Sequence, residues 1–186
     1  PGIGQHVNGG SGILAYASWT NNTELAAKEI NFRFEFLDKL IFKDGYIDNN
    51  SFRGYRAQWY HSYGVNNTLG YVYIADLWGA EVPDKLQKKL VKASEVVNLA
   101  ITDWDKFKSR EYTGSSGLTN SIRDPSNAIK HTHQMAFGLD TLMKIIVDFE
   151  LAKDSTYLQK RKNHMTYGTD DLIGFNPNCI HKLVTE

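Results

Sequence analysis

The sequence has one cysteine, no net charge and no long apolar run, and each of these features excludes a class of protein. The single cysteine, Cys179, excludes an internal disulfide framework and a thiolate metal cluster. Lysine and arginine together number 21, as do aspartate and glutamate, so the chain lacks the basic excess of general nucleic-acid and membrane-surface binders. No apolar run approaches the roughly 18 residues that a membrane span needs. We therefore expect no nucleic-acid partner and no membrane partner.

Motifs for metals and cofactors are also missing. The sequence has no His-x-x-x-His or Cys-x-x-Cys pair, no Asp-rich calcium loop and no glycine-rich phosphate loop before a helix. His131 and His133 stand two positions apart, which on a helix directs them to different faces and disfavours a two-histidine metal clamp. We therefore expect no metal and no other cofactor.

The opening PGIGQHVNGG has neither an initiator methionine nor the features of a signal peptide. We interpret the chain as a mature or processed piece of a longer protein. Sequons at Asn21, Asn49 and Asn66 permit a secreted glycoprotein without establishing one. The expected location is secreted or periplasmic.

Helical periodicity runs through almost the whole sequence. The clearest start is Asn22 or Thr23, which suits an N-cap, and the clearest stop is Lys43-Asp44-Gly45. The expected helices begin at residue 11 and cover 22–42, 51–79, 82–101 and 128–152, with a long polar loop over 109–127. The four tryptophans lie in apolar-periodic segments where core packing is the default interpretation. The length suits one domain, residues 1–186, with an all-α fold of antiparallel helical hairpins.

The stretch SFRGYRAQWYHSYG, residues 51–64, concentrates arginine, histidine and aromatic rings. On a single helix, Arg53, Arg56 and Tyr60 would share one face. Arginines on neighbouring turns repel each other, so a bound anion between them would relieve that cost. Positive charge beside a tyrosine hydroxyl favours the phenolate, which can abstract a proton without a metal. The alternative is structural: an arginine stacked on Tyr60 or Trp59.

A second block gives this stretch a family context. His6 stands in the glycine-rich opening, 47 residues before Arg53 and 54 before Tyr60. The layout resembles the alginate lyases of the poly(mannuronate) type, in which an Asn-His pair opens one helix and a later R-x-x-R-A-L-x-Y-H-x-Y-A motif follows. The residues that match this motif are Arg53, Arg56, Ala57, Tyr60, His61 and Tyr63. The resemblance covers residues 5–80, and beyond them only the helical layout is similar.

This resemblance implies a polysaccharide lyase that cleaves a 4-linked uronan, such as alginate, polymannuronate or glucuronan, by β-elimination. Neutralising the substrate carboxylate would stabilise the enolate-like intermediate. The family pattern assigns that neutralisation to Gln5, His6 and Arg53. It makes Tyr60 the base and then the acid toward the leaving 4-oxygen, with His6 the alternative base for the opposite C5 stereochemistry. The implied catalytic residues are thus His6, Arg53 and Tyr60, and the implied substrate-binding residues are Gln5, Arg56, His61 and Tyr63.

The sequence departs from the family pattern near the histidine. Gln5 replaces the family's asparagine, and residues 7–10, Val-Asn-Gly-Gly, replace an aromatic pair that would stack on a sugar ring. Gln58 replaces the leucine of the later motif. These departures leave the identity of the uronan open. They also leave open the alternative that the chain is a catalytically silent protein of the same fold that binds acidic polysaccharide.

The resemblance further implies an (α/α) toroid. In that family the histidine block lies about midway along the toroid, so this chain would be the C-terminal part of an incomplete one. Because each hairpin packs on its neighbours, half a toroid would leave apolar helix faces unburied. We therefore expect an N-terminal chain or segment that completes it.

Overall fold

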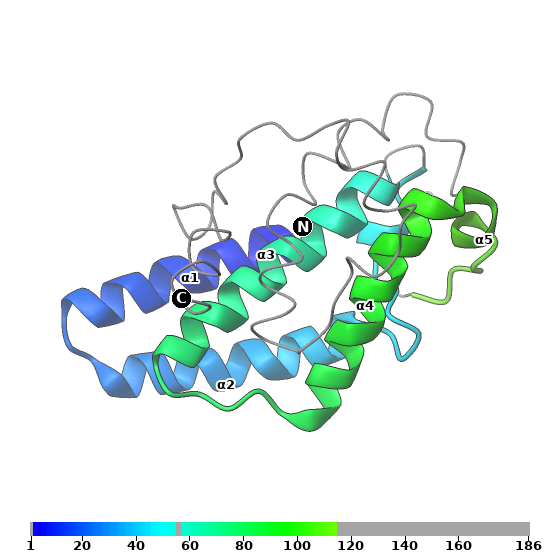
Figure 1. Ribbon diagram of the computed structural model, residues 1–186. Coiled ribbons are helices and arrows are strands. Elements are labelled where there is room, and N and C mark those ends of the chain that lie inside the picture. Colours follow the sequence, from blue (N-terminus) through cyan, green and yellow to red (C-terminus); the bar gives the residue numbers. More distant parts are fainter. Residues whose placement is uncertain (1, 55–56, 115–186) are drawn as a thin grey trace, which may run out of the picture.

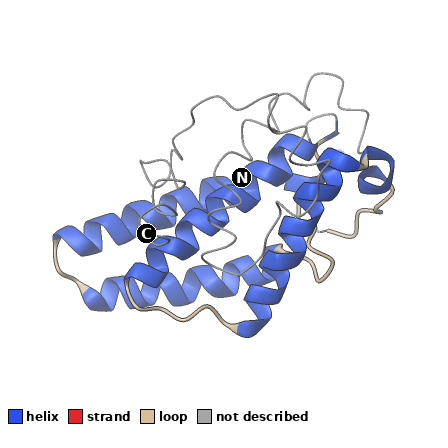
Figure 2. Ribbon diagram, viewed as in Figure 1, coloured by secondary structure: helices blue, strands red, loops and turns tan. Residues whose placement is uncertain are grey.

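The computed structural model describes residues 2–54 and 57–114 of the chain, and this part is helical (Figure 2). Its elements are α1 (Ile3–Trp19), α2 (Thr23–Leu40), the 3₁₀ helix η1 (Asn50–Phe52), α3 (Ala57–Leu77), α4 (Asp84–Thr102) and α5 (Trp104–Lys108). Within the described ranges no strand forms, and the β-type pairing found there is an isolated bridge between Ile41 and Ile47. The all-α class is therefore confirmed for these residues. The helix expected at 128–152, most of the loop over 109–127, the His131–His133 pair and Cys179 lie outside them.

Helices α1 and α3 run side by side in the same direction, and α2 returns antiparallel to α1 (Figure 1). The pairing of α1 with α3 follows from two close approaches: Gly4 lies against Tyr63, and Gly10 lies against Tyr71. Helix α4 packs on α3 and reaches the second half of α2, where Lys85 and Lys89 both form ion pairs with Asp38. None of the described helices is long and apolar enough to cross a membrane.

The helices expected at 22–42 and 82–101 are confirmed as α2 and α4, and local signals explain the bounds of α2. The Asn22 side chain accepts a hydrogen bond from the Leu25 amide at 2.9 Å and so caps the first turn. After α2 the chain turns through Gly45, which has a φ of +89°. A Cβ atom at Gly45 would lie 2.2 Å from the backbone carbonyl carbon of Lys92, so only glycine fits this turn against α4.

Helix α1 begins eight residues earlier than the sequence predicted, at Ile3 rather than Ser11. Glycine costs a helix roughly 1 kcal/mol per residue, which is why the glycine-rich opening argued against helix. Two of these glycines are needed by the packing. A Cβ atom at Gly4 would lie 2.4 Å from the Tyr63 ring, and one at Gly10 would lie 2.5 Å from Glu29 Oε1. Tertiary contact with α2 and α3 therefore outweighs the low helix propensity.

The continuous helix expected over 51–79 is also corrected. Residues 50–52 form η1, Gly54 has a φ of +60°, and α3 begins only at Ala57. The Ser51 hydroxyl accepts a hydrogen bond from the Ile47 amide at 2.7 Å, which fixes a tight turn instead of starting a long helix. Arg53 thus precedes α3 and does not share a helical face with Tyr60.

Most of the core lies among the four long helices. Between α1, α2 and α3 it includes a buried ion pair, in which Arg33 Nη2 lies 2.7 Å from Glu29 Oε1. Gly10 leaves room for this pair beside the Tyr71 ring. The largest fully buried side chains are Tyr71, Phe52, Phe107, Ile3, Leu14, Leu37, Ile41, Ile47, Leu69, Leu86 and Leu90.

Large apolar side chains stay exposed on the first hairpin. Ile13 and Tyr16 of α1 are 38% and 54% exposed, and Phe32 of α2 is 57% exposed. Trp19, at the end of α1, is 84% exposed, which corrects the expectation that it packs in the core. A soluble surface seldom gathers several large apolar residues on neighbouring helices without a partner.

Candidate functional site

Arg53 and Tyr60 are in contact at the start of α3. Tyr60 lies in the first turn of the helix, and the Arg53 Cζ atom lies 4.8 Å from the centroid of its ring. That distance is within the roughly 6 Å range of cation–π attraction. The structure therefore brings the two predicted residues together, through the turn before α3. It places the guanidinium over the face of the ring, which is the stacked arrangement that the sequence left open.

Asn50 joins this contact to the start of α1. Its Oδ1 atom accepts a hydrogen bond from the Ile3 amide at 3.2 Å, and its Nδ2 atom donates to the Tyr60 carbonyl at 2.9 Å. The side chain is buried, so both bonds form in a low-dielectric setting. Asn50 was not among the predicted site residues. A link between residues 47 positions apart leaves no local pattern that could have identified it.

Tyr63 sits one turn further along α3 and faces α1. The Asn8 amide donates a hydrogen bond to its hydroxyl at 3.4 Å. The Trp59 and Tyr63 rings stack with centroids 5.5 Å apart, and the Trp59 and Tyr60 rings meet edge to face at 4.6 Å. We call Trp59, Tyr60 and Tyr63 the aromatic cluster. All three side chains are partly buried, so the cluster borders solvent beside Asn8, which sequence reasoning had treated only as a departure from the family.

His6 and Gln5 lie on different sides of α1. Gln5 is exposed, and its Oε1 atom accepts a hydrogen bond from the Gly2 amide at 3.1 Å. The His6 ring packs on Phe36 of α2 at a centroid distance of 4.6 Å. Burial lowers the pKa of His6, and the nearby positive charge of Arg33 lowers it further. Both effects favour the neutral ring, which is able to accept a proton. Among the described residues, the contacts of His6 are with α2 and none joins it to Arg53 or Tyr60.

His61 is fully buried behind α4. Its Nδ1 atom lies 2.8 Å from the Ser51 hydroxyl and its Nε2 atom lies 2.9 Å from the Ala93 carbonyl. Since the carbonyl can only accept, Nε2 carries the proton and the hydroxyl donates to Nδ1. Burial lowers the pKa of His61 to about 4. This placement disfavours the implied substrate-binding role, because both ring nitrogens are bonded within the protein and the ring has no exposed surface.

Arg56 lies outside the described residues. In the part of the chain that the structure describes, no group of three or more His, Cys, Asp or Glu side chains could hold a metal ion. In comparisons with known proteins, no family model, no curated protein and no solved structure matches the chain.

Proposed function

We propose that this protein is a polysaccharide lyase that cleaves a 4-linked uronan by β-elimination, with Tyr60 as the acid–base residue. The observation that carries the proposal is the contact between Arg53 and Tyr60. A cation next to a phenol can serve β-elimination, because one group neutralises a carboxylate while the other moves a proton. Asn50 bonds the Tyr60 carbonyl and the Trp59 ring packs on the Tyr60 ring, and both contacts suit a group that must act at one position.

The reaction uses these groups in sequence. The uronate carboxylate binds the N–H groups of the Arg53 guanidinium, whose Cζ atom lies over the Tyr60 ring. Tyr60, as the phenolate, removes the proton from C5, and the electron pair moves into the carboxylate-stabilised enolate. The double bond then forms between C4 and C5 as the C4–O4 bond breaks. Tyr60 returns its proton to the leaving oxygen, so atoms and charge balance without an oxidant.

We also propose that the described helices are part of an (α/α) toroid. Helices α1 and α3 lie next to each other and run in the same direction, as successive inner helices of such a fold do. Helices α2 and α4 pair with them as the outer members of two hairpins. The exposed Ile13, Tyr16 and Phe32 support an additional N-terminal segment or chain that packs on the first hairpin. A secreted or periplasmic location remains a prediction.

The second candidate is a catalytically silent protein of the same fold that binds acidic polysaccharide. The positions of two side chains favour it. The Gln5 amide oxygen is bonded to the Gly2 amide, and His6 packs on Phe36 of α2. Two of the three groups that the family pattern assigns to carboxylate neutralisation are therefore engaged away from Tyr60. Arg53 alone would still give a cationic surface for a uronate.

An assay of the unsaturated product distinguishes the two candidates. The full chain is incubated separately with polymannuronate, polyguluronate and glucuronan, and the ultraviolet absorbance of the unsaturated uronide is followed. The lyase proposal predicts product from at least one of these polymers. Binding by calorimetry without product from any of them would reject the lyase and leave the binding protein.

A further inference from the structure

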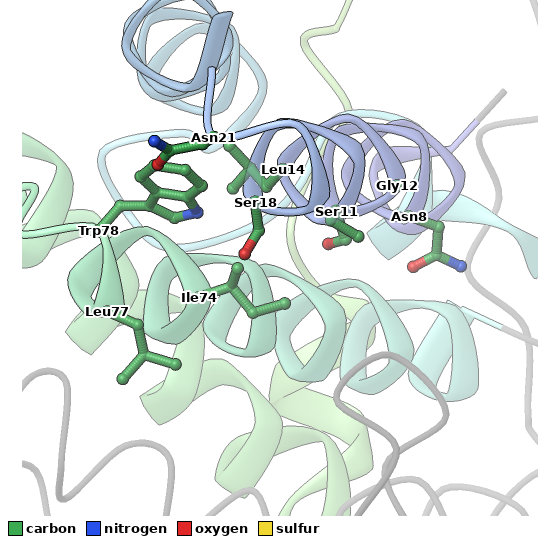
Figure 3. Close-up of a pocket in the computed structure, with 10 residues that line it drawn as sticks. Asn8, Ser11, Gly12, Leu14, Ser18, Asn21, Ile74, Leu77 and Trp78 are labelled. Atoms are coloured by element: carbon green, nitrogen blue, oxygen red, sulfur yellow. The ribbon is translucent and has the colours of Figure 1, made fainter. Parts of the chain in front are cut away.

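A long groove lies between α1 and α3 (Figure 3). Its volume is about 820 Å³, within the size range of ligand sites. It is lined by Asn8, Ser11, Gly12, Leu14, Ala15, Ser18, Asn21, Ile74, Leu77 and Trp78. None of these side chains is charged, although the chain as a whole is 23% charged.

One end of the groove lies next to the aromatic cluster. Asn8 lines its first part and donates its hydrogen bond to Tyr63 of the aromatic cluster. From Asn8 the groove follows α1 to Asn21, which at about 1.5 Å per helical residue gives a length of roughly 20 Å. A chain of several sugar rings therefore fits between the cluster and the far end.

The chemistry of the lining selects the kind of sugar. On the α1 side, the Asn8 amide and the Ser11 and Ser18 hydroxyls line the groove opposite Ile74 of α3, and Trp78 closes the far end beside Asn21 (Figure 3). Amides and hydroxyls pair with sugar hydroxyls, and an indole offers an apolar face to a pyranose ring. A uronate in the same place would have to bring a carboxylate against a wall whose described residues carry no cation, which is unfavourable.

We propose that this groove binds uncharged sugar residues of the substrate chain. The substrate class is then a mixed polysaccharide, in which the uronate at Arg53 and Tyr60 is joined to neutral sugars that run toward Trp78. The assignment of the Asn8 end to the reacting uronate rests on the proposed function. The affinity of the groove for neutral sugars rests on its lining alone.

Two glycines of α1 provide a matched test. A Cβ atom at Gly12 or at Gly9 would meet no atom within 4 Å, so a side chain can leave the helix at both positions without a clash at its base. Gly12 lines the groove and Gly9 does not. The substitution Gly12→Phe therefore fills the groove, and Gly9→Phe adds the same ring to the same helix outside it. Circular dichroism should be unchanged in both.

The probe is a neutral 4-linked mannohexaose, titrated calorimetrically into the full chain. The proposal predicts binding that Gly12→Phe weakens at least tenfold and that Gly9→Phe leaves within twofold. Trp78→Ala should also weaken it, whereas Trp19→Ala, which removes an exposed ring outside the groove, should not. No binding of the hexamer, or equal affinities for Gly12→Phe and Gly9→Phe, would overturn the proposal.

Lyase activity on uronans, measured in the same variants, separates this inference from the proposed function. Hexamer binding that depends on Gly12, with no product from any uronan, would reject the lyase and keep the groove. Product from a uronan together with no hexamer binding would reject the groove and keep the lyase.

Discussion

The guanidinium of Arg53 rests on the ring of Tyr60, with Cζ 4.8 Å from the ring centroid, although the two residues belong to different structural elements. This contact combines a planar cation and a ring face. Lysine can supply the charge, but not the flat stacking surface or the fork of N–H donors. The pair is therefore sensitive to the kind of cation as well as to its charge.

Replacing Arg53 tests this pair directly. In the lyase assay, Arg53→Ala should lower kcat/KM by about 10²–10³-fold, the usual loss when one group that stabilises developing negative charge is removed. Arg53→Lys should recover part of the activity. A variant Arg53→Ala with full activity would show that another residue neutralises the carboxylate.

The buried His61 predicts a dependence of stability on pH. Its pKa is about 4 in the folded chain against an ordinary value of 6.5, so between these values the unfolded chain binds the proton more tightly. Stability is then fully present above pH 6.5 and is lost as the pH falls toward 4. At about 1.4 kcal/mol per pKa unit, the loss is on the order of 3 kcal/mol.

Urea unfolding at pH 7 and pH 5 measures this effect. His61→Gln keeps a donor for the Ala93 carbonyl and removes the titration, so its free energy of unfolding should vary less between the two pH values than that of the parent chain. Equal pH dependence in the two proteins would assign the effect to other groups.

Adjacent glycines of α1 should respond in opposite directions to alanine. Gly10→Ala would force a Cβ atom to within 2.5 Å of Glu29 Oε1 and 2.8 Å of Arg33 Nε, in the buried ion pair. We expect it to lower the free energy of unfolding by about 1–3 kcal/mol, as overpacking does. Gly9→Ala meets no atom and should raise stability by roughly 0.5–1 kcal/mol, because alanine is the better helix former. Urea midpoints measure both, and a stabilising Gly10→Ala would contradict the packing described for α1.

The exposed apolar residues of the first hairpin predict the behaviour of the chain in solution. If a further segment normally covers them, the 186-residue chain alone should associate, and light scattering should give masses above 21.1 kDa. Replacing Tyr16 and Phe32 with serine should shift the distribution toward 21.1 kDa. A parent chain that is a stable, monodisperse monomer would contradict the proposed N-terminal partner.

Sequence reasoning succeeded where the signal was local. Helical periodicity and the Asn22 cap predicted α2, and periodicity alone predicted α4. It failed at the start of α1, because the packing that requires Gly4 and Gly10 comes from helices far along the chain. It also failed at Ser51, whose hydroxyl could equally cap a helix or fix a turn, and only the fold decides between them.

The same distinction between local and long-range signals holds for the candidate site. Arg53 and Tyr60 are in contact, but a turn brings them together rather than the helix face that was predicted. Their joint role at a carboxylate stays a prediction. Motif spacing could not separate Tyr60 from its neighbour His61, which points to the opposite side of α3 and is buried against α4. Asn50 and Asn8 were missed as positioning residues because their partners are 10 or more residues away.

The most direct test of the account is the effect of Tyr60→Phe on uronan cleavage. The substitution removes only the hydroxyl and keeps the ring that Arg53 and Trp59 contact, so the fold should be unchanged by circular dichroism. The matched control is Tyr16→Phe, on the exposed side of α1. We predict that Tyr60→Phe abolishes formation of the unsaturated uronide while Tyr16→Phe retains it. Full activity of Tyr60→Phe would contradict the proposed mechanism.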